Sequence, residues 1–120
     1  MKRIVLKGTE LDVSQVGFGT ASLHHSLLYS QRQKLVKKAL DIGISHFDTA
    51  RMYGNGISEV TLGKILSGSA RRDVTIATKV GFEVSNLQKS FPLLCHVSGK
   101  LSQNHILRPV NYSVQALDRS

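Results

Sequence analysis

Short apolar segments alternate with longer amphipathic ones over residues 3–80. Two extended pieces, Arg3 to Leu6 and Glu10 to Val13, lie on either side of a turn at residues 7–9 and predict a small hairpin. Residues 16–20 are short and apolar and contain two glycines, which is typical of a buried strand that other backbone approaches closely. The chain is therefore expected to begin with three strands, of which the first two form a hairpin.

The first predicted helix follows this strand. Ser30 and Gln33 have the spacing of a capping box, in which a serine hydroxyl and a glutamine side chain bind the free backbone amide groups of a helix start. Gly43 is placed to end the helix. Apolar residues recur at helical spacing between these points and predict one buried face. The residues of that face are Leu35, Val36, Ala39 and Leu40.

A second strand and helix repeat the same order. Ile44 to Thr49 is predicted to be a short strand, after which Ser58 can cap a helix and Gly68 can end it. Glu59 falls in the first turn of that helix, where a negative charge suits the helix dipole. The apolar positions of the helix are Val60, Leu62, Ile65 and Leu66.

Residues 74–80 form a third predicted strand, with apolar residues on both faces. Strands of this kind that alternate with helices indicate a parallel sheet covered by helices. After Gly81 the periodicity fades, and residues 82–109 are predicted to be irregular, either a functional loop or a loosely ordered segment, because ordinary connections are much shorter. Asn111 to Arg119 is expected to form the opening turns of another helix.

Composition limits the classes of protein that the chain can represent. Its 120 residues suffice for one domain, and 41% of them are hydrophobic, so a buried core is expected. The single cysteine, Cys95, excludes an internal disulfide framework and a multi-cysteine metal site. No apolar run is long enough for a secretory leader or a membrane span. The sequence thus predicts a soluble, cytoplasmic protein without a membrane partner.

The net charge of +8 makes a nucleic-acid-binding protein the rival class. However, lysines and arginines are spread over every segment, and the aromatic residues do not alternate with basic ones, so no nucleic-acid partner is predicted. The neighbouring His24 and His25 could be a metal pair. Adjacent side chains on an extended backbone point apart, and no third ligand is spaced nearby, so no metal is predicted.

Polar residues follow each predicted parallel strand, at the sheet edge where α/β proteins place their chemistry. They are Thr20 after the first strand, Asp48 and Thr49 after the second, Tyr53 in the loop that follows, and Lys79 after the third. An aspartate, a tyrosine and a lysine together are suited to acid catalysis, because an ammonium group stabilises a neighbouring phenolate and the aspartate would hold the lysine. As isolated residues, aspartate, tyrosine and lysine at loop edges are more often helix caps and solvated surface.

Several motifs, in order and spacing, resemble the N-terminal part of the aldo/keto reductases. The resemblance rests on residues 16–20, 43–50, 53–56, 58–59, 62–63 and 75–81. It covers residues 1 to about 82, and residues 113–120 look like the family's third helix. Members of the family are (β/α)₈ barrels that bind NADPH or NADH without a Rossmann domain, and they reduce aldehydes and ketones or oxidise alcohols.

The resemblance implies roles for individual positions. Tyr53 matches the general acid that protonates the carbonyl oxygen, and Lys79 matches the residue that tunes the tyrosine. Asp48 matches the carboxylate that pairs with the lysine near the nicotinamide ribose, and Thr20 and Ala21 match the turn beside the nicotinamide. The implied catalytic residues are thus Asp48, Tyr53 and Lys79, and the implied cofactor-binding residues are Thr20, Ala21 and Asp48. The implied cofactor is NADP(H) or NAD(H), and the implied substrate is a small carbonyl compound, alcohol or sugar.

The resemblance also implies that residues 1–120 are a partial, C-terminally incomplete aldo/keto reductase domain. The predicted fold is α/β, the N-terminal part of a (β/α)₈ TIM barrel, with about three β/α units after a β-hairpin and no closed barrel. The family's catalytic histidine would lie beyond Ser120, whereas His96 and His105 fall in the irregular segment. We therefore expect little carbonyl reduction or cofactor binding by the 120 residues alone, and a non-catalytic remnant of the reductase scaffold stays open as the alternative.

Overall fold

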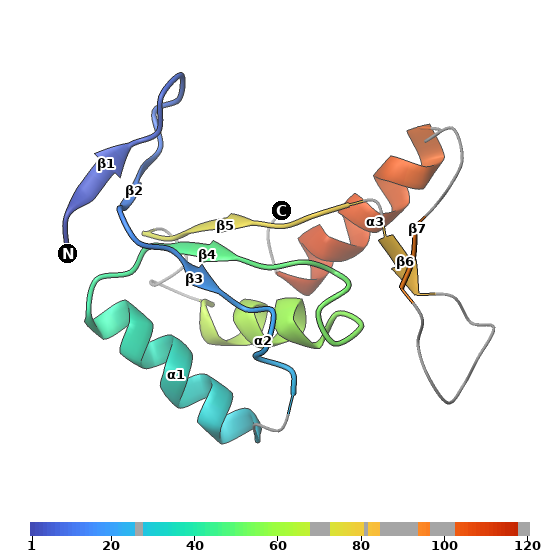
Figure 1. Ribbon diagram of the computed structural model, residues 1–120, viewed down its shortest axis with the longest axis horizontal. Helices are drawn as coiled ribbons and strands as arrows, with labels where there is room; N and C mark the ends of the chain where they lie inside the picture. Colours follow the sequence, from blue (N-terminus) through green and yellow to red (C-terminus); the bar gives the residue numbers. More distant parts are fainter. Residues whose placement is uncertain (26–27, 68–72, 81, 85–93, 97–102, 118–120) are drawn as a thin grey trace.

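The computed structural model describes residues 1–25, 28–67, 73–80, 82–84, 94–96 and 103–117 (Figure 1). Strands and helices alternate through the middle of the chain, as the hydrophobic pattern predicts. In chain order the elements are β1 (Arg3–Val5), β2 (Asp12–Ser14), β3 (Phe18–Gly19), α1 (Tyr29–Asp41), β4 (His46–Asp48), α2 (Ile57–Ile65), β5 (Thr75–Ala77), β6 (Phe82–Val84), β7 (Leu94–His96) and α3 (Gln103–Ala116).

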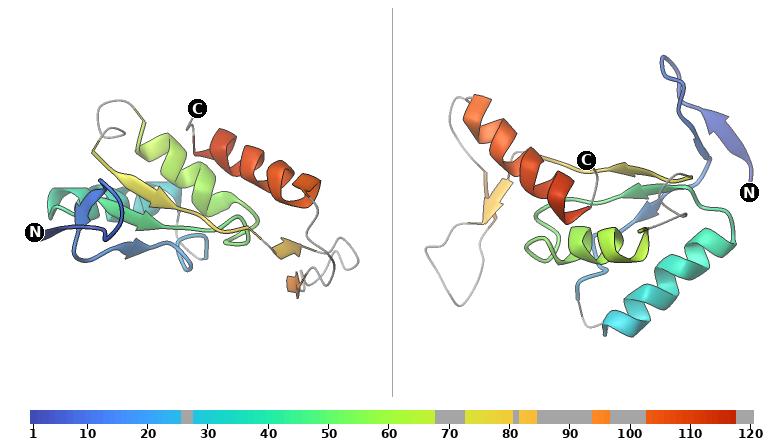
Figure 2. Two further views of the ribbon diagram at one scale, coloured as in Figure 1. Left: turned by 90° about the horizontal axis from the view of Figure 1, so that it is seen from above. Right: turned by 180° about the vertical axis from the view of Figure 1, so that it is seen from behind.

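Strands β3, β4 and β5 form a parallel sheet in that order. Phe18 of β3 pairs with Phe47 of β4, and Phe47 pairs with Ile76 of β5. Helices α1 and α2 pack side by side on one face of this sheet, and α3 contacts α2 (Figures 1 and 2). Within the described residues the sheet does not close on itself. The predicted α/β class, a partial barrel of β/α units, is therefore confirmed.

The hydrophobic core lies between the sheet and the helices. Phe47 of β4 is fully buried, and its ring centroid is 5.8 Å from that of Phe18 in β3. Val36 of α1 and Leu62 of α2 are fully buried in the same cluster, and Leu117, just after α3, joins it. Because these side chains come from five segments, the core fixes the direction of the strands and hence the position of their carboxyl ends.

Strands β1 and β2 form the predicted antiparallel hairpin, with Ile4 opposite Val13. Two serines attach this hairpin to the start of β4. The N–H of Ser14 donates to the hydroxyl of Ser45, and the N–H of Ser45 donates to the hydroxyl of Ser14, both at 2.9 Å. The hairpin is thus held at the end of the sheet where β4 begins, opposite the polar strand ends.

The predicted capping box of the first helix is wrong by two residues. Helix α1 begins at Tyr29, so Ser30 lies inside it. The N–H of Leu28 donates to Oε1 of Gln31 at 2.9 Å, which makes Gln31 the glutamine that satisfies the helix start. Gly43 adopts a φ of 87°, a left-handed conformation that an L side chain rarely adopts, and it follows the end of α1 as predicted.

The predicted cap of the second helix is also wrong. Helix α2 begins at Ile57 after Gly56, so Ser58 lies inside the helix. The hydroxyl of Ser58 donates to the carbonyl oxygen of Thr20 at 3.2 Å rather than accepting a hydrogen bond at the start of the helix. A partner 38 positions away in the sequence therefore displaced the local capping interaction. The predicted helix end at Gly68 lies outside the described residues.

Residues 82–109 contain more regular structure than their sequence predicts. Strands β6 and β7 pair antiparallel, and α3 begins at Gln103 rather than at Asn111. Each of the two strands has three residues, too few for an alternating pattern to show. Pro109 lies inside α3 and, because proline usually ends a helix, it obscured the helical pattern.

None of the helices in the described ranges is long and apolar enough to cross a membrane.

The contact between α2 and α3 depends on Gly63. A Cβ atom added there would overlap the carbonyl oxygen of Ala116 and would lie 3.1 Å from Cα of Leu117. We expect Gly63→Ala to lower the free energy of unfolding by about 1–3 kcal/mol, because the two backbones must separate. Urea denaturation followed by circular dichroism measures this loss. The control is Gly19→Ala, where an added Cβ meets nothing within 4 Å; equal stability losses in both variants would contradict the packing explanation.

Candidate active site

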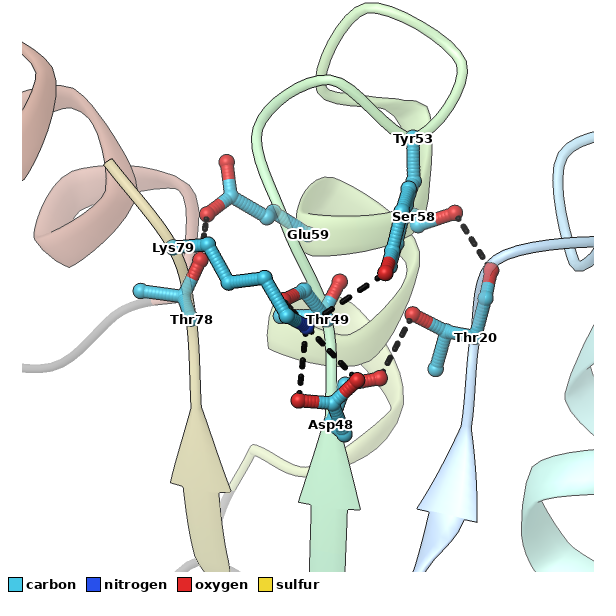
Figure 3. Close-up of polar contacts among 8 residues, drawn as sticks. All are labelled: Thr20, Asp48, Thr49, Tyr53, Ser58, Glu59, Thr78 and Lys79. Atoms are coloured by element: carbon cyan, nitrogen blue, oxygen red, sulfur yellow. Dashed lines mark hydrogen bonds and ion pairs between the residues drawn. The ribbon is translucent and has the colours of Figure 1, made fainter. Parts of the chain in front are cut away.

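Polar side chains gather at the carboxyl ends of the three parallel strands (Figure 3). Asp48 is the last residue of β4, and Lys79 follows β5 by two residues. Tyr53 lies in the connection between β4 and α2. The structure brings together these three side chains, the ones that the sequence singles out, because neighbouring parallel strands end at the same edge of the sheet.

The ammonium group of Lys79 is the centre of this cluster. Its Nζ lies 2.7 Å from each carboxylate oxygen of Asp48 and 3.0 Å from the carbonyl oxygen of Thr49. It also lies 3.3 Å from the phenolic oxygen of Tyr53 and 5.2 Å from the centroid of the tyrosine ring. One cation therefore connects the carboxylate to the phenol, the arrangement expected for an acid-catalytic group.

These contacts change the proton affinity of the lysine. Burial favours the neutral amine, but hydrogen bonds to Asp48 and Tyr53 and the charge of Asp48 outweigh it, so the pKa of Lys79 is raised above its ordinary value of 10.5. Lys79 and Asp48 are both partly exposed, with 45% and 43% of their side-chain surface accessible. The lysine therefore stays charged at neutral pH and remains reachable by a ligand.

Removing the carboxylate should reverse this effect. We expect Asp48→Asn to lower the pKa of Lys79, because the charge that favours the ammonium form is lost while burial remains. NMR titration of the lysine side chain measures the pKa. The matched control is Asp12→Asn, which removes an exposed carboxylate paired with Arg3 at 2.8 Å, far from the cluster. An unchanged pKa of Lys79 in Asp48→Asn would refute the conclusion that Asp48 raises the pKa of this lysine.

The same pKa shift predicts a pH dependence of stability. Because the pKa of Lys79 is raised in the folded protein, its stabilising contribution is fully present below the ordinary value of 10.5 and is lost as the pH rises through the raised value. We expect the difference in unfolding free energy between the wild-type protein and Asp48→Asn to decrease across that range. Urea denaturation at several alkaline pH values tests this sign.

Thr20 and Ala21, predicted to lie beside a nicotinamide, follow β3. Thr20 is fully buried, and its hydroxyl donates to the carbonyl oxygen of Asp48 at 3.1 Å while its N–H donates to the same oxygen at 2.9 Å. The side chain of Thr20 thus ties β3 to β4 beside the cluster. Ala21, the next residue, is exposed at the turn. Their contact with a cofactor stays a prediction.

Glu59 is a member of this region that the sequence did not assign to the site. It is fully buried in the first turn of α2, and its Oε1 accepts a hydrogen bond from the hydroxyl of Thr78 at 2.7 Å (Figure 3). Thr78 directly precedes Lys79. The signal available in the sequence was the spacing of Glu59 with Leu62 and Leu66, which places it on the buried face of the helix.

The histidines and the cysteine contribute no further described site. The rings of His24 and His25 lie 4.1 Å apart, and burial together with the neighbouring His25 lowers the pKa of His24. Among the described residues no three potential ligands gather around one point. Cys95 and His96 lie on β7, and His105 lies on α3.

Comparison with known protein families identifies the family of this chain. Residues 15–120 match the sequence model of the Aldo/keto reductase family. The chain belongs to the aldo/keto reductase family. The match extends through β6, β7 and α3, so the region that the sequence left irregular is part of this reductase fold as well.

Relatives of this aldo/keto reductase chain are considerably longer. The aldo-keto reductase YhdN of Bacillus subtilis is 32% identical over 93 residues, which cover 73% of this chain and 28% of the relative. The L-galactose dehydrogenase of Arabidopsis thaliana is 38% identical over 81 residues, 63% of this chain and 25% of the relative. The chain thus spans about a quarter of the length of these curated relatives.

A solved structure of the family has the same arrangement of elements. The holo form of the aldo-keto reductase AKR11C1 from Bacillus halodurans superposes with a TM-score of 0.82 at 30% identity. The superposition covers 98% of this chain and 37% of that one. Nearly all of the present fold is therefore similar to part of that aldo-keto reductase.

Proposed function

We propose that Tyr53 donates the proton in an NAD(P)H-dependent reduction of small aldehydes or ketones, and accepts it in the reverse oxidation of alcohols or sugars. The observation that carries this proposal is the contact of Lys79 Nζ with the phenolic oxygen of Tyr53 at 3.3 Å and with both carboxylate oxygens of Asp48 at 2.7 Å. Membership in the aldo/keto reductase family supports it.

These distances support the proposed proton transfer. A carbonyl oxygen hydrogen-bonded to the phenol of Tyr53 takes the phenolic proton as hydride reaches the carbonyl carbon, so the O–H bond of the tyrosine breaks and that of the alcohol forms. The phenolate that remains is stabilised by the ammonium group of Lys79. Asp48 holds that ammonium group in place and favours its charged form.

The residues at this edge fit a nicotinamide cofactor of the NADP(H) or NAD(H) type. The carboxylate of Asp48 is partly exposed and can accept a hydrogen bond from a ribose hydroxyl, and Ala21 is exposed at the turn after β3. When bound, such a cofactor supplies the hydride. We include Asp48, Thr20 and Ala21 among the residues that would contact it.

As a separate polypeptide, the 120 residues are proposed to be a partial domain with little turnover. Each outer strand of the described sheet, β3 and β5, pairs with β4 alone, whereas a closed barrel of this family has eight strands. An open sheet edge neither encloses a substrate nor excludes water. The alternative function, a non-catalytic form of the reductase scaffold, rests on the same open edges. We further propose a cytoplasmic location and no nucleic-acid or membrane partner.

Two polypeptides separate these proposals. The first is residues 1–120 alone, and the second joins them to the remaining residues of the Bacillus halodurans reductase, which would complete the barrel. Oxidation of NADPH and NADH is followed with a panel of aldehydes, ketones and sugars. We expect background turnover from the first and clear turnover from the second. Turnover by residues 1–120 alone would refute the partial-domain proposal, and a folded but inactive fusion would refute the catalytic one.

A further inference from the structure

A pocket of about 290 Å³ is lined by residues of α1, of α2 and of the connection before α2. The two helices lie side by side (Figure 2). Asp48, Tyr53 and Lys79 do not line this pocket. Its lining residues are Tyr29, Arg32, Arg51, Asn55, Gly56, Ile57, Val60, Thr61 and Lys64.

Three of these lining residues are cations. None of the described residues that line the pocket carries a carboxylate. Arg32 comes from α1, Lys64 from α2, and Arg51 from the connection between β4 and α2. Like charges that converge on one pocket repel one another unless an anion lies between them. Three segments therefore bring positive charges to one pocket, where an anionic ligand would stabilise them.

One of the cations has a buried donor atom that is unpaired among the described residues, and another is stacked on an aromatic ring. The Nε atom of Arg32 is buried and has no hydrogen-bond partner in the described structure, so a polar donor is left unused beside the pocket. The guanidinium group of Arg51 lies 4.9 Å from the ring centroid of Tyr112 in α3. Its Nη1 would be 3.2 Å from a Cβ at Gly56, which means that the glycine leaves room for this guanidinium. A guanidinium group that is stacked on an aromatic ring, as that of Arg51 is, is well suited to recognise an anion.

The chemistry of the lining selects the class of anion. Guanidinium groups pair with phosphate through parallel hydrogen bonds, and a lysine adds a point charge. Tyr29, Ile57 and Val60 add apolar surface that a bare ion would not use. The volume is at the small end of the range for ligand pockets, which favours a small molecule over a polymer. We propose that this pocket binds a small organic phosphate, with Arg32, Arg51 and Lys64 around the phosphate group.

The test is a binding measurement that does not require turnover, so it is independent of the proposed reductase function. Inorganic phosphate and glycerol 3-phosphate are titrated into the 120-residue protein, and binding is followed by NMR amide shifts and calorimetry. We expect saturable binding of both probes, tighter for glycerol 3-phosphate, with shifts confined to α1, α2 and the connection before α2.

Charge-removing variants locate the site. Arg32→Gln and Lys64→Gln should each weaken binding about tenfold, the loss expected for one charge-assisted contact. Lys34→Gln and Lys37→Gln are matched controls, since both lysines are exposed on α1 and do not line the pocket. They should change affinity less than twofold. Lys64 is exposed, so its replacement is expected to preserve the fold even if that of Arg32 does not.

Three outcomes would overturn the proposal. The first is the absence of saturable binding of either probe. The second is an equal loss of affinity in the pocket variants and in the control variants, which would indicate general attraction to a positive surface. The third is tighter binding of a DNA duplex that pocket and control variants weaken equally, which would point to the charge of +8 as a whole.

Discussion

Replacing Tyr53 with phenylalanine should lower carbonyl reduction about 100- to 10,000-fold in a completed barrel that contains residues 1–120, because positioned general acids contribute rate factors of this size. Phenylalanine retains the ring over which Lys79 lies and removes only the hydroxyl that Nζ contacts at 3.3 Å. The loss should fall on kcat, because the proton moves in the transition state and nucleotide binding does not need the phenol. Steady-state kinetics and fluorescence titration of NADPH separate the two quantities.

The control for Tyr53→Phe is Thr9→Ala, which also removes one hydroxyl. Thr9 donates to the carbonyl oxygen of Leu6 at 2.9 Å in the turn between β1 and β2, far from the strand ends. We expect the carbonyl-reducing activity of the Thr9→Ala variant to stay within twofold of that of the wild type. If Tyr53→Phe retained a similar activity, the phenol would not be the proton donor. Lys79→Met should also lower activity, whereas loss of nucleotide binding in that variant would instead assign the lysine to the cofactor.

The convergence of Asp48, Tyr53 and Lys79 could be predicted because it depends on topology alone. Two β/α units in succession predict parallel strands, and parallel strands end at one edge of the sheet. Residues 48 and 79 are 31 positions apart, yet their side chains meet at 2.7 Å because β4 and β5 are neighbours in register. Family resemblance added the roles, but the juxtaposition itself follows from the alternation of strands and helices.

What could not be predicted depends on partners that are distant in the sequence. Ser58 has the local sequence signature of a helix cap, but its hydroxyl donates a hydrogen bond to the carbonyl oxygen of Thr20. Glu59 suits the helix dipole and its spacing places it on the buried face of α2, but its hydrogen bond with Thr78 follows only from the packing of α2 on the sheet. Polar side chains have several local partners of similar energy, so tertiary contacts decide among them. Apolar faces have one dominant requirement, burial, and Val36, Leu62 and Leu66 are buried as their spacing predicts. Leu35 and Val60, which the sequence placed on the same apolar faces, are 44% and 42% exposed, because they lie at the edges of those faces.

Phe47→Ala should lower the free energy of unfolding by about 3–5 kcal/mol, the range for deletion of a large core aromatic. Phe47 is fully buried in the middle strand, and its ring contacts that of Phe18 with the centroids 5.8 Å apart. Removing it opens a cavity against Val36 and Leu62 that the flanking helices cannot fill without leaving the sheet. Because small domains have a total stability of about 5–15 kcal/mol, this one change removes a large share of it.

Urea denaturation followed by circular dichroism measures the loss at Phe47, and Val5→Ala is the control. Val5 is 64% exposed on β1, so its truncation should cost less than about 0.5 kcal/mol. A loss below about 1 kcal/mol at Phe47 would mean that the sheet and the helices do not form one cooperative core. In that case the strand ends would lack a rigid support, and the separation of Lys79 from Tyr53 would vary in solution. The stability of Phe47→Ala therefore tests the framework on which the proposed proton transfer depends.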